Sequence, residues 1–147
     1  MKKTVFIILL IATVVTSCKN TEKKEVIDVS GLYSNTWVKE IELNNDNKWQ
    51  ANSETNEGVL KMQNSIKTQP TNTLVEYFAL VEQLNVDKNY VIKNCTMKGD
   101  SHDNLHVWLL PLIAKIDALS EAKTIEDAAK LKQSIKENMN AYFDYFE

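Results

Sequence analysis

Residues 124–146 read TIEDAAKLKQSIKENMNAYFDYF, and this stretch decides the fold. Apolar side chains recur in it at intervals of three and four residues, which is the spacing of one face of an α-helix. Thr124 precedes the first turn as an N-cap, and no Gly or Pro interrupts the pattern. We therefore predict a long amphipathic helix, which has to bury one side against other helices. Its expected core face consists of Ala128, Leu131, Ile135, Met139, Tyr142 and Phe146.

The segment from Ser53 to Pro70 predicts a first helix by the same argument. Ser53 is a favourable N-cap, and the carboxylates of Glu54 and Glu57 suit the positive end of the helix dipole. Pro70 ends the segment because it cannot continue a helix. The expected face is a narrow stripe that consists of Thr55, Val59, Met62 and Ile66.

A capping box opens the second predicted helix, since Thr73 is followed three residues later by Glu76. Polar residues interrupt the apolar pattern further along, so we expect a kink or break near residues 85–87. The face predicted for this helix consists of Leu74, Phe78, Val81, Ile92 and Cys95.

The third predicted helix follows Gly99, which closes the connection from the second. We expect Asp100 or Ser101 to cap it, and Pro111 in its middle predicts a kink. Its face consists of His102, Leu105, Leu109, Leu112, Ile116 and Leu119.

Four helices with short connections favour an all-α fold, an up-down-up-down antiparallel four-helix bundle over residues 52–147. Residues 31–51 lack a helical period, and we predict an irregular arm that Trp37 and Trp49 anchor to the bundle. Antiparallel order brings alternate helix ends to one pole of the bundle. The residues expected at that pole are Trp49, Glu54, Cys95, Met97, His102, His106, Tyr142, Phe143 and Tyr145.

The N-terminal residues predict a bacterial lipoprotein. Two lysines precede an apolar run over residues 5–15, and the sequence Val-Thr-Ser-Cys at residues 15–18 is similar to a lipobox. We predict a signal peptide over residues 1–17, lipidation (palmitate included) at Cys18 and a polar tether over residues 18–30. An uncleaved anchor helix is the alternative, which the short apolar run and the polar residues after it disfavour. The lipid would hold the protein in the cell envelope, at the outer membrane on its periplasmic or its surface side.

Charge excludes one class of partner. The formal net charge of the chain is −3, and the removal of residues 1–17 leaves fifteen lysines against twenty acidic residues, a net charge of −5. The chain contains no Arg. Nucleic-acid binding depends on a basic surface, so we expect no nucleic-acid partner. The lipid would provide contact with the membrane, and the sequence names no protein partner.

The chemistry of the chain is concentrated in residues 94–106, which hold both histidines of the sequence. Lipidation of Cys18 would leave Cys95 without a disulfide partner. A lone thiol in an oxidising compartment is unusual and requires an explanation. It could be buried, bind a metal, or pair with another molecule. His102 and His106 are one helical turn apart, a spacing at which two imidazoles can share one ion.

Together with Met97 these residues form a soft ligand set, which suits copper as Cu(I) or as thiolate-bound Cu(II). Zinc would use Cys95 and the two histidines but gain little from the thioether. Glu54 and Asp103 are candidates to cap helices or to orient a histidine ligand. Each of these residues also has an ordinary structural reading, with the cysteine and the methionine as core side chains.

Catalysis has weaker support. Cys95 with His102 or His106 could form a thiolate–imidazole pair, but no oxyanion site is recognisable and the pair would lie at the end of a bundle. We therefore predict that the protein is not an enzyme.

The last predicted helix resembles that of the cytochrome b562 family. The resemblance rests on residues 127–132 (DAAKLK) and 140–143 (NAYF), with a weaker likeness of residues 53–56 (SETN) to the start of the family's first helix. It covers residues 53–147 and implies the same four-helix bundle. The family's haem-binding methionine and histidine fall on Ser53 and Phe143, neither of which can bind haem iron.

The resemblance therefore implies the fold without the haem, and the chain has no Cys-x-x-Cys-His motif for covalent attachment. The chain also resembles small lipoproteins of Bacteroidetes-type bacteria, in the pattern Lys-Trp-x-x-Asn-x-Glu-Thr of residues 48–55 and in Cys-x-Met-x4-His-x3-His of residues 95–106.

The leading hypothesis from the sequence is a lipid-anchored bundle that binds copper through Cys95, Met97, His102 and His106, for metal handling or electron transfer. The alternative is a metal-free envelope module that binds a protein or a small apolar ligand. A third possibility is haem binding through one of the histidines with Met97.

Overall fold

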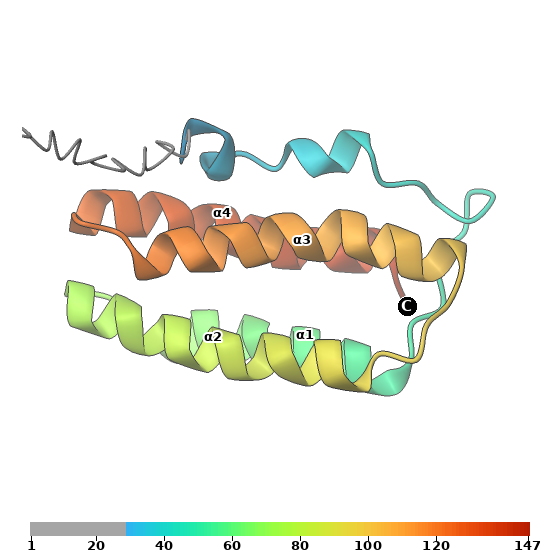
Figure 1. Cartoon of the computed structure of the whole chain (residues 1–147), viewed down its shortest axis with the longest axis horizontal. Coiled ribbons are helices and arrows are strands. Elements are labelled where there is room, and N and C mark those ends of the chain that lie inside the picture. Colours follow the sequence, from blue (N-terminus) through green and yellow to red (C-terminus); the bar gives the residue numbers. More distant parts are fainter. Residues whose placement is uncertain (1–28) are drawn as a thin grey trace, which may run out of the picture.

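The computed structural model describes residues 29–147, so the predicted signal peptide and the predicted lipidation site, Cys18, lie outside the described residues. All regular elements of the described part are helices, in the arrangement that the sequence predicts (Figure 1). Two short 3-10 helices come first, η1 (Val29–Tyr33) and η2 (Thr36–Lys39). The four α-helices are α1 (Ser53–Thr68), α2 (Leu74–Asn94), α3 (Asp100–Ser120) and α4 (Ile125–Tyr145).

The α-helices form an antiparallel bundle of two pairs, α1 with α2 and α3 with α4 (Figure 1). Further contacts of α2 with α3 and of α1 with α4 close the bundle. One hydrophobic core runs through it, and within the described residues its buried apolar side chains extend from Trp37 to Phe146. A protein that begins at Lys19 therefore retains all of these core side chains, and their burial is the main term that stabilises the fold.

The core faces of α3 and α4 agree with the sequence prediction. All six residues predicted for α4 are buried, as are the four leucines and the isoleucine predicted for α3. Thr124 caps α4, because its hydroxyl accepts a hydrogen bond from the backbone N–H of Asp127 at 3.1 Å. The chain continues as one helix through Pro111.

The predicted cap of α3 is wrong. The N-cap residue is Gly99, which has a φ of 60° and no side chain to accept a bond from the first turn. Glycine adopts this left-handed conformation without steric cost, which explains its place here. The hydroxyl of Ser101 donates instead to the carbonyl of Lys98, at 3.1 Å.

The predicted face of α2 is also partly wrong, and the break expected near residues 85–87 is absent from this unbroken helix. Phe78 and Ile92, which we expected in the core, are 36% and 51% exposed. Tyr77 and Val91, each one position earlier, are buried in their place, the polar Asp87 is buried as well, and Val81 is buried as predicted. The buried residues are Tyr77, Leu80, Val81, Leu84, Asp87 and Val91.

Close packing of α1 on α2 depends on Gly58. A Cβ atom built at this position would lie 2.3 Å from Cγ2 of Val91 and 3.3 Å from Cδ1 of Tyr90. Helix α1 begins one residue earlier than predicted, because Asn52 rather than Ser53 is the N-cap residue and Ser53 lies in the first turn. The predicted capping box of α2 is present, with Thr73 and Glu76 bonded reciprocally.

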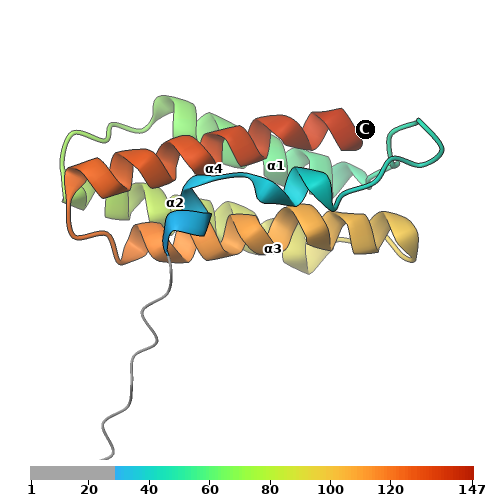
Figure 2. The same ribbon diagram turned by 90° about the horizontal axis from the view of Figure 1, so that it is seen from above.

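The arm lies along the α3–α4 pair and returns to the end of α4 (Figure 2). The side chain of Trp37 is 3% exposed, as predicted for an anchor. Trp49 forms a parallel β-bridge with Phe146, with hydrogen bonds of 2.8 Å from its N–H to the carbonyl of Tyr145 and 3.0 Å from the N–H of Glu147 to its carbonyl. Both predicted anchors therefore hold the arm.

Among residues 29–147, no helix is both long enough and apolar enough to cross a membrane.

Candidate metal-binding pole

The candidate site lies where the α2–α3 connection, residues 95–99, passes the start of α1 and the end of α4 (Figure 1). We call this end of the bundle the histidine pole. The side chain of Asn52 links the start of α1 to the end of α2 and to the α2–α3 connection. The Asn52 Oδ1 atom accepts hydrogen bonds from the Thr55 hydroxyl at 2.8 Å and from the backbone N–H of Thr96 at 3.2 Å. Its Nδ2 atom donates to the carbonyl of Asn94 at 3.1 Å.

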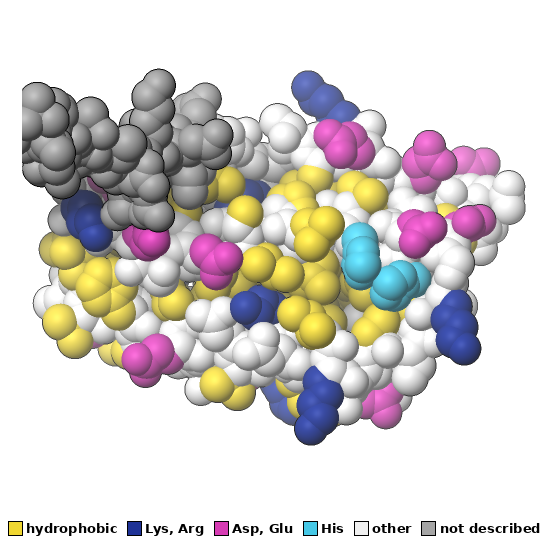
Figure 3. Space-filling view, in the orientation of Figure 1, with side chains coloured by type: hydrophobic (Ala, Val, Ile, Leu, Met, Phe, Trp, Pro, Cys, Tyr) yellow, Lys and Arg dark blue, Asp and Glu magenta, His cyan; other side chains and the backbone are white. Residues whose placement is uncertain are grey.

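The two imidazoles lie side by side on the first turns of α3, and Figure 3 shows both at the surface. The ring centroids of His102 and His106 are 4.3 Å apart, and the ring planes are inclined by 52°. His102 is half-buried and His106 is exposed. The Nδ1 atom of His102 lies 3.9 Å from a carboxylate oxygen of Asp103. The predicted i, i+4 pairing of the imidazoles is thus present.

The two sulfur-bearing residues lie beside the core rather than on the outer surface. Cys95 is the C-cap residue of α2, carries a free thiol and is half-buried. Its N–H donates to the carbonyl of Val91 at 2.9 Å. Met97 is likewise half-buried, and both side chains pack against the core. A thiol and a thioether are therefore held on the connection that leads into the histidine helix.

The structure brings together part of the predicted ligand set. Within residues 29–147, no three side chains of the His, Cys, Asp and Glu types lie close enough to hold a metal ion. The imidazole pair is assembled, whereas Cys95 does not complete a three-ligand group with it.

Glu54 and Asp103, the predicted supporting carboxylates, lie in different surroundings. The Glu54 carboxylate accepts hydrogen bonds from Asn52 at 2.8 Å and from the Ser53 hydroxyl at 3.1 Å, and these bonds lower its pKa, the one from Asn52 most. Asp103 is the carboxylate beside an imidazole. Glu54 thus stabilises the start of α1, whereas Asp103 lies near His102 at a distance longer than a hydrogen bond.

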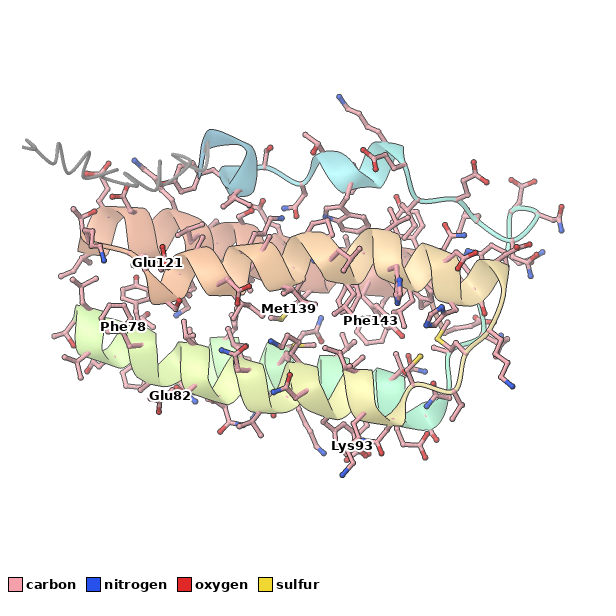
Figure 4. All side chains as sticks on the ribbon, in the orientation of Figure 1. Phe78, Glu82, Lys93, Glu121, Met139 and Phe143 are labelled. Atoms are coloured by element: carbon pink, nitrogen blue, oxygen red, sulfur yellow. The ribbon has the colours of Figure 1, made fainter. Side chains whose placement is uncertain are left out.

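Aromatic side chains of α4 form the inner side of the pole. Tyr142 stacks on Phe146 with centroids 4.8 Å apart and meets Phe143 edge-on at 5.0 Å. Burial raises the pKa of the Tyr142 phenol, with a smaller electrostatic contribution from the neighbouring Cys95. Its hydroxyl donates to Oδ1 of Asn56 at 2.8 Å, so it stays protonated. Phe143 is directed into the space between the two helix pairs (Figure 4).

Sequence reasoning missed a buried lysine. Lys115 of α3 is 1% exposed, and its ammonium group donates to the side-chain oxygens of Asn35 in the arm and Asn138 in α4. Burial lowers its pKa to about 8, an effect that the more distant charge of Glu137 opposes. A lysine four residues after Pro111 on a mostly apolar helix gives no pattern that separates it from a surface residue.

Comparisons with known proteins yield no relative. No protein-family model matches the chain, and neither a curated protein nor a solved structure matches it.

Proposed function

We propose that this protein is a lipid-anchored four-helix bundle of the bacterial cell envelope that binds a soft metal ion, copper above all, at the histidine pole. The observation that carries the proposal is the imidazole pair, with centroids 4.3 Å apart on one face of α3. Its role would be copper handling or one-electron transfer.

Two nitrogen donors one helical turn apart can bind the same ion, and the two sulfurs of the connection supply the soft ligands that select Cu(I). Met97 and Cys95 precede the helix by only a few residues, so a sulfur reaches the imidazoles through an adjustment of side chains and of the connection. Binding would then draw residues 95–99 toward α3.

The pole is suited to a soft ion rather than to a hard one. Magnesium and calcium require several oxygen ligands, and the two carboxylates predicted to support the site are separated, with Glu54 at the start of α1 and Asp103 beside His102. A half-buried thiol and thioether favour Cu(I) over a hard ion because both sulfurs are polarisable.

The test is a competition titration of Cu(I) into protein that begins at Lys19, with a chromogenic chelator of known affinity. We expect one copper ion per chain. The double variant Cys95→Ser/His102→Ala should lose it, and so should His106→Ala with Met97→Leu. Lys98→Ala, on the same connection but with an exposed side chain, is the matched control and should bind as the wild type does. Undiminished copper binding by Cys95→Ser/His102→Ala would refute the proposal.

The second candidate is a metal-free binding module of the envelope. The observation in its favour is an apolar outer face on α2, where Val75, Val86 and Ile92 are exposed. This candidate predicts that Cys95 reacts with thiol reagents at the same rate with and without Cu(I). It also predicts that a chelator leaves the melting temperature unchanged, whereas the copper proposal predicts protection of the thiol by the metal.

A further inference from the structure

A groove separates the second half of α1 from the central part of α4. Its volume is about 760 Å³, within the range of sites that hold small molecules. Its floor is apolar and includes Ile66, Tyr77 and Met139, all of which are buried. Figure 2 shows α1 and α4 as neighbours, and Figure 4 shows Met139 directed between the helix pairs.

Lysines surround this apolar floor. Lys67 comes from the last turn of α1, and Lys132 and Lys136 come from one face of α4. The remaining lining residues are neutral, and none is an Asp or a Glu. They are Gln63, Thr71, Ala129, Gln133 and Asn140.

The three lysines have no carboxylate partner in the described part of the chain. The ion pairs that lysines form there join Lys61 to Glu57 and Lys130 to Glu126. The Nζ atom of Lys132 donates to the neutral hydroxyl of Thr71 at 2.7 Å. All charged residues that line this groove are therefore positive, although the net charge of the chain is −3.

The electrostatics of the groove favour an added anion. Partial burial lowers the pKa of Lys132, and the neighbouring charge of Lys136 lowers it further. The two ammonium groups therefore repel each other along this face of α4. A bound anion would relieve this repulsion and accept charge-assisted hydrogen bonds from both.

We propose that the groove binds a small amphiphilic anion, a carboxylate on an apolar chain such as a medium-chain fatty acid. The carboxylate would lie between Lys132 and Lys136, and the chain would lie on Ile66 and Met139. Charge alone would attract any anion, and the apolar floor alone would attract any hydrocarbon. The combination selects a molecule that has both parts.

This site is separate from the histidine pole. The groove includes Lys67 and Thr71, at the end of α1 and in the α1–α2 connection, whereas the pole lies at the start of α1. The proposal does not depend on copper binding, and removal of the pole ligands should leave it intact.

Isothermal titration calorimetry of protein that begins at Lys19 tests the proposal, with decanoate as the probe. We expect saturable binding of one decanoate per chain. Lys132→Gln/Lys136→Gln should weaken it at least about tenfold, the loss expected for removed charge-assisted hydrogen bonds. Lys136→Arg should retain binding, since it keeps the charge. Lys130→Gln is the matched control, because Lys130 lies on the same helix but pairs with Glu126.

Three results would overturn the proposal. The first is equal binding of decyltrimethylammonium, which would show that hydrocarbon alone is recognised. The second is inorganic phosphate binding as tightly as decanoate, which would show that the apolar floor has no part. The third is unchanged decanoate affinity in the double Gln variant. Circular dichroism and melting of each variant exclude loss of folding as the cause, because all three lysine side chains lie at the groove rim rather than in the core.

Discussion

The two helix pairs of the bundle bury opposite charges and satisfy them differently. The α1–α2 pair buries Asp87, whose carboxylate accepts hydrogen bonds from the Ser65 hydroxyl at 2.9 Å and from Gln83 at 3.0 Å. Both donors belong to the same pair of helices. The α3–α4 pair buries Lys115, whose ammonium donates to Asn138 of α4 at 3.5 Å and also to a partner from outside the pair, Asn35 of the arm.

This difference explains why the arm follows α3 and α4. Oδ1 of Asn35 accepts from Lys115 and also from Nε1 of Trp37 at 2.9 Å, while its Nδ2 donates to the carbonyl of Ser134 at 3.2 Å. One amide side chain therefore joins the arm to both helices of the pair. The α1–α2 pair is complete by itself, whereas the α3–α4 pair is complete only with the arm in place.

The largest effect is expected for Trp37→Ala, which removes the anchor of the arm. Loss of a fully buried tryptophan should lower the free energy of unfolding by about 3–5 kcal/mol. It also removes the N–H that holds Oδ1 of Asn35, and so loosens the partner of Lys115. Chemical denaturation followed by circular dichroism measures the change.

Val38→Ala is the matched control, because Val38 is the next residue of η2 and is 40% exposed. We expect a change below about 0.5 kcal/mol for it. If Trp37→Ala were as mild as Val38→Ala, the arm would not be part of the folding unit.

The next effect concerns pH and belongs to the α3–α4 pair. The pKa of Lys115 is about 8 in the folded chain because of burial, against about 10.4 for a lysine in an unfolded chain. Between these values the unfolded chain holds a proton that the folded chain has released, so stability rises with pH. From pH 7 to pH 9.5 the free energy of unfolding should rise by about 2 kcal/mol from this group.

Lys115→Met keeps the length of the side chain and should abolish that rise, whereas the surface variant Lys130→Met should retain it. Denaturant titrations at pH 7 and pH 9.5 measure both. The range stops below pH 10 because burial raises the pKa of Tyr142, and stability gained from that phenol is lost above its ordinary pKa. Parallel pH profiles of wild type and Lys115→Met would show that Lys115 does not titrate as stated.

The sequence predicts the bundle because periodicity reports burial where the core face is apolar. The faces of α3 and α4 are uninterrupted, and their leucines and isoleucines all lie in the core. Helix α2 misleads because Asp87 and Tyr77 lie inside, while Phe78 and Ile92 lie outside. From the sequence alone, a buried polar residue is predicted to lie at the surface unless its hydrogen-bond partner is known. The partner of Asp87 is Ser65, which lies 22 residues away in the chain, on α1.

The candidate sites also differ in how far the sequence alone predicts them. The imidazole pair is predictable because one helical turn separates His102 from His106, a purely local relation. The distance of Cys95 from that pair depends on the path of the α2–α3 connection, which local spacing does not determine. The lysine groove joins α1 to α4, residues more than sixty positions apart, and becomes visible only once the helices are packed.

The last prediction compares two buried serines, one in each helix pair. Ser65→Ala removes a donor from the carboxylate of Asp87 and should cost about 1.5 kcal/mol, the value of a hydrogen bond to a charged group. Ser134 is equally buried, but its Oγ atom has no hydrogen-bond partner in the described part of the chain. Ser134→Ala should therefore be neutral, or stabilising by less than about 1 kcal/mol.

Chemical denaturation of the two variants under identical conditions measures the contrast, and the difference between them is more informative than either value. Both substitutions remove the same hydroxyl from a helix interior, so the gain in helix propensity from alanine is common to both and cancels. What remains is the partner of each hydroxyl, a carboxylate within the α1–α2 pair and none within the α3–α4 pair. Equal losses of stability would mean that Ser65 contributes no more to holding Asp87 than an unpaired hydroxyl does, and the α1–α2 pair would then depend on Gln83 alone.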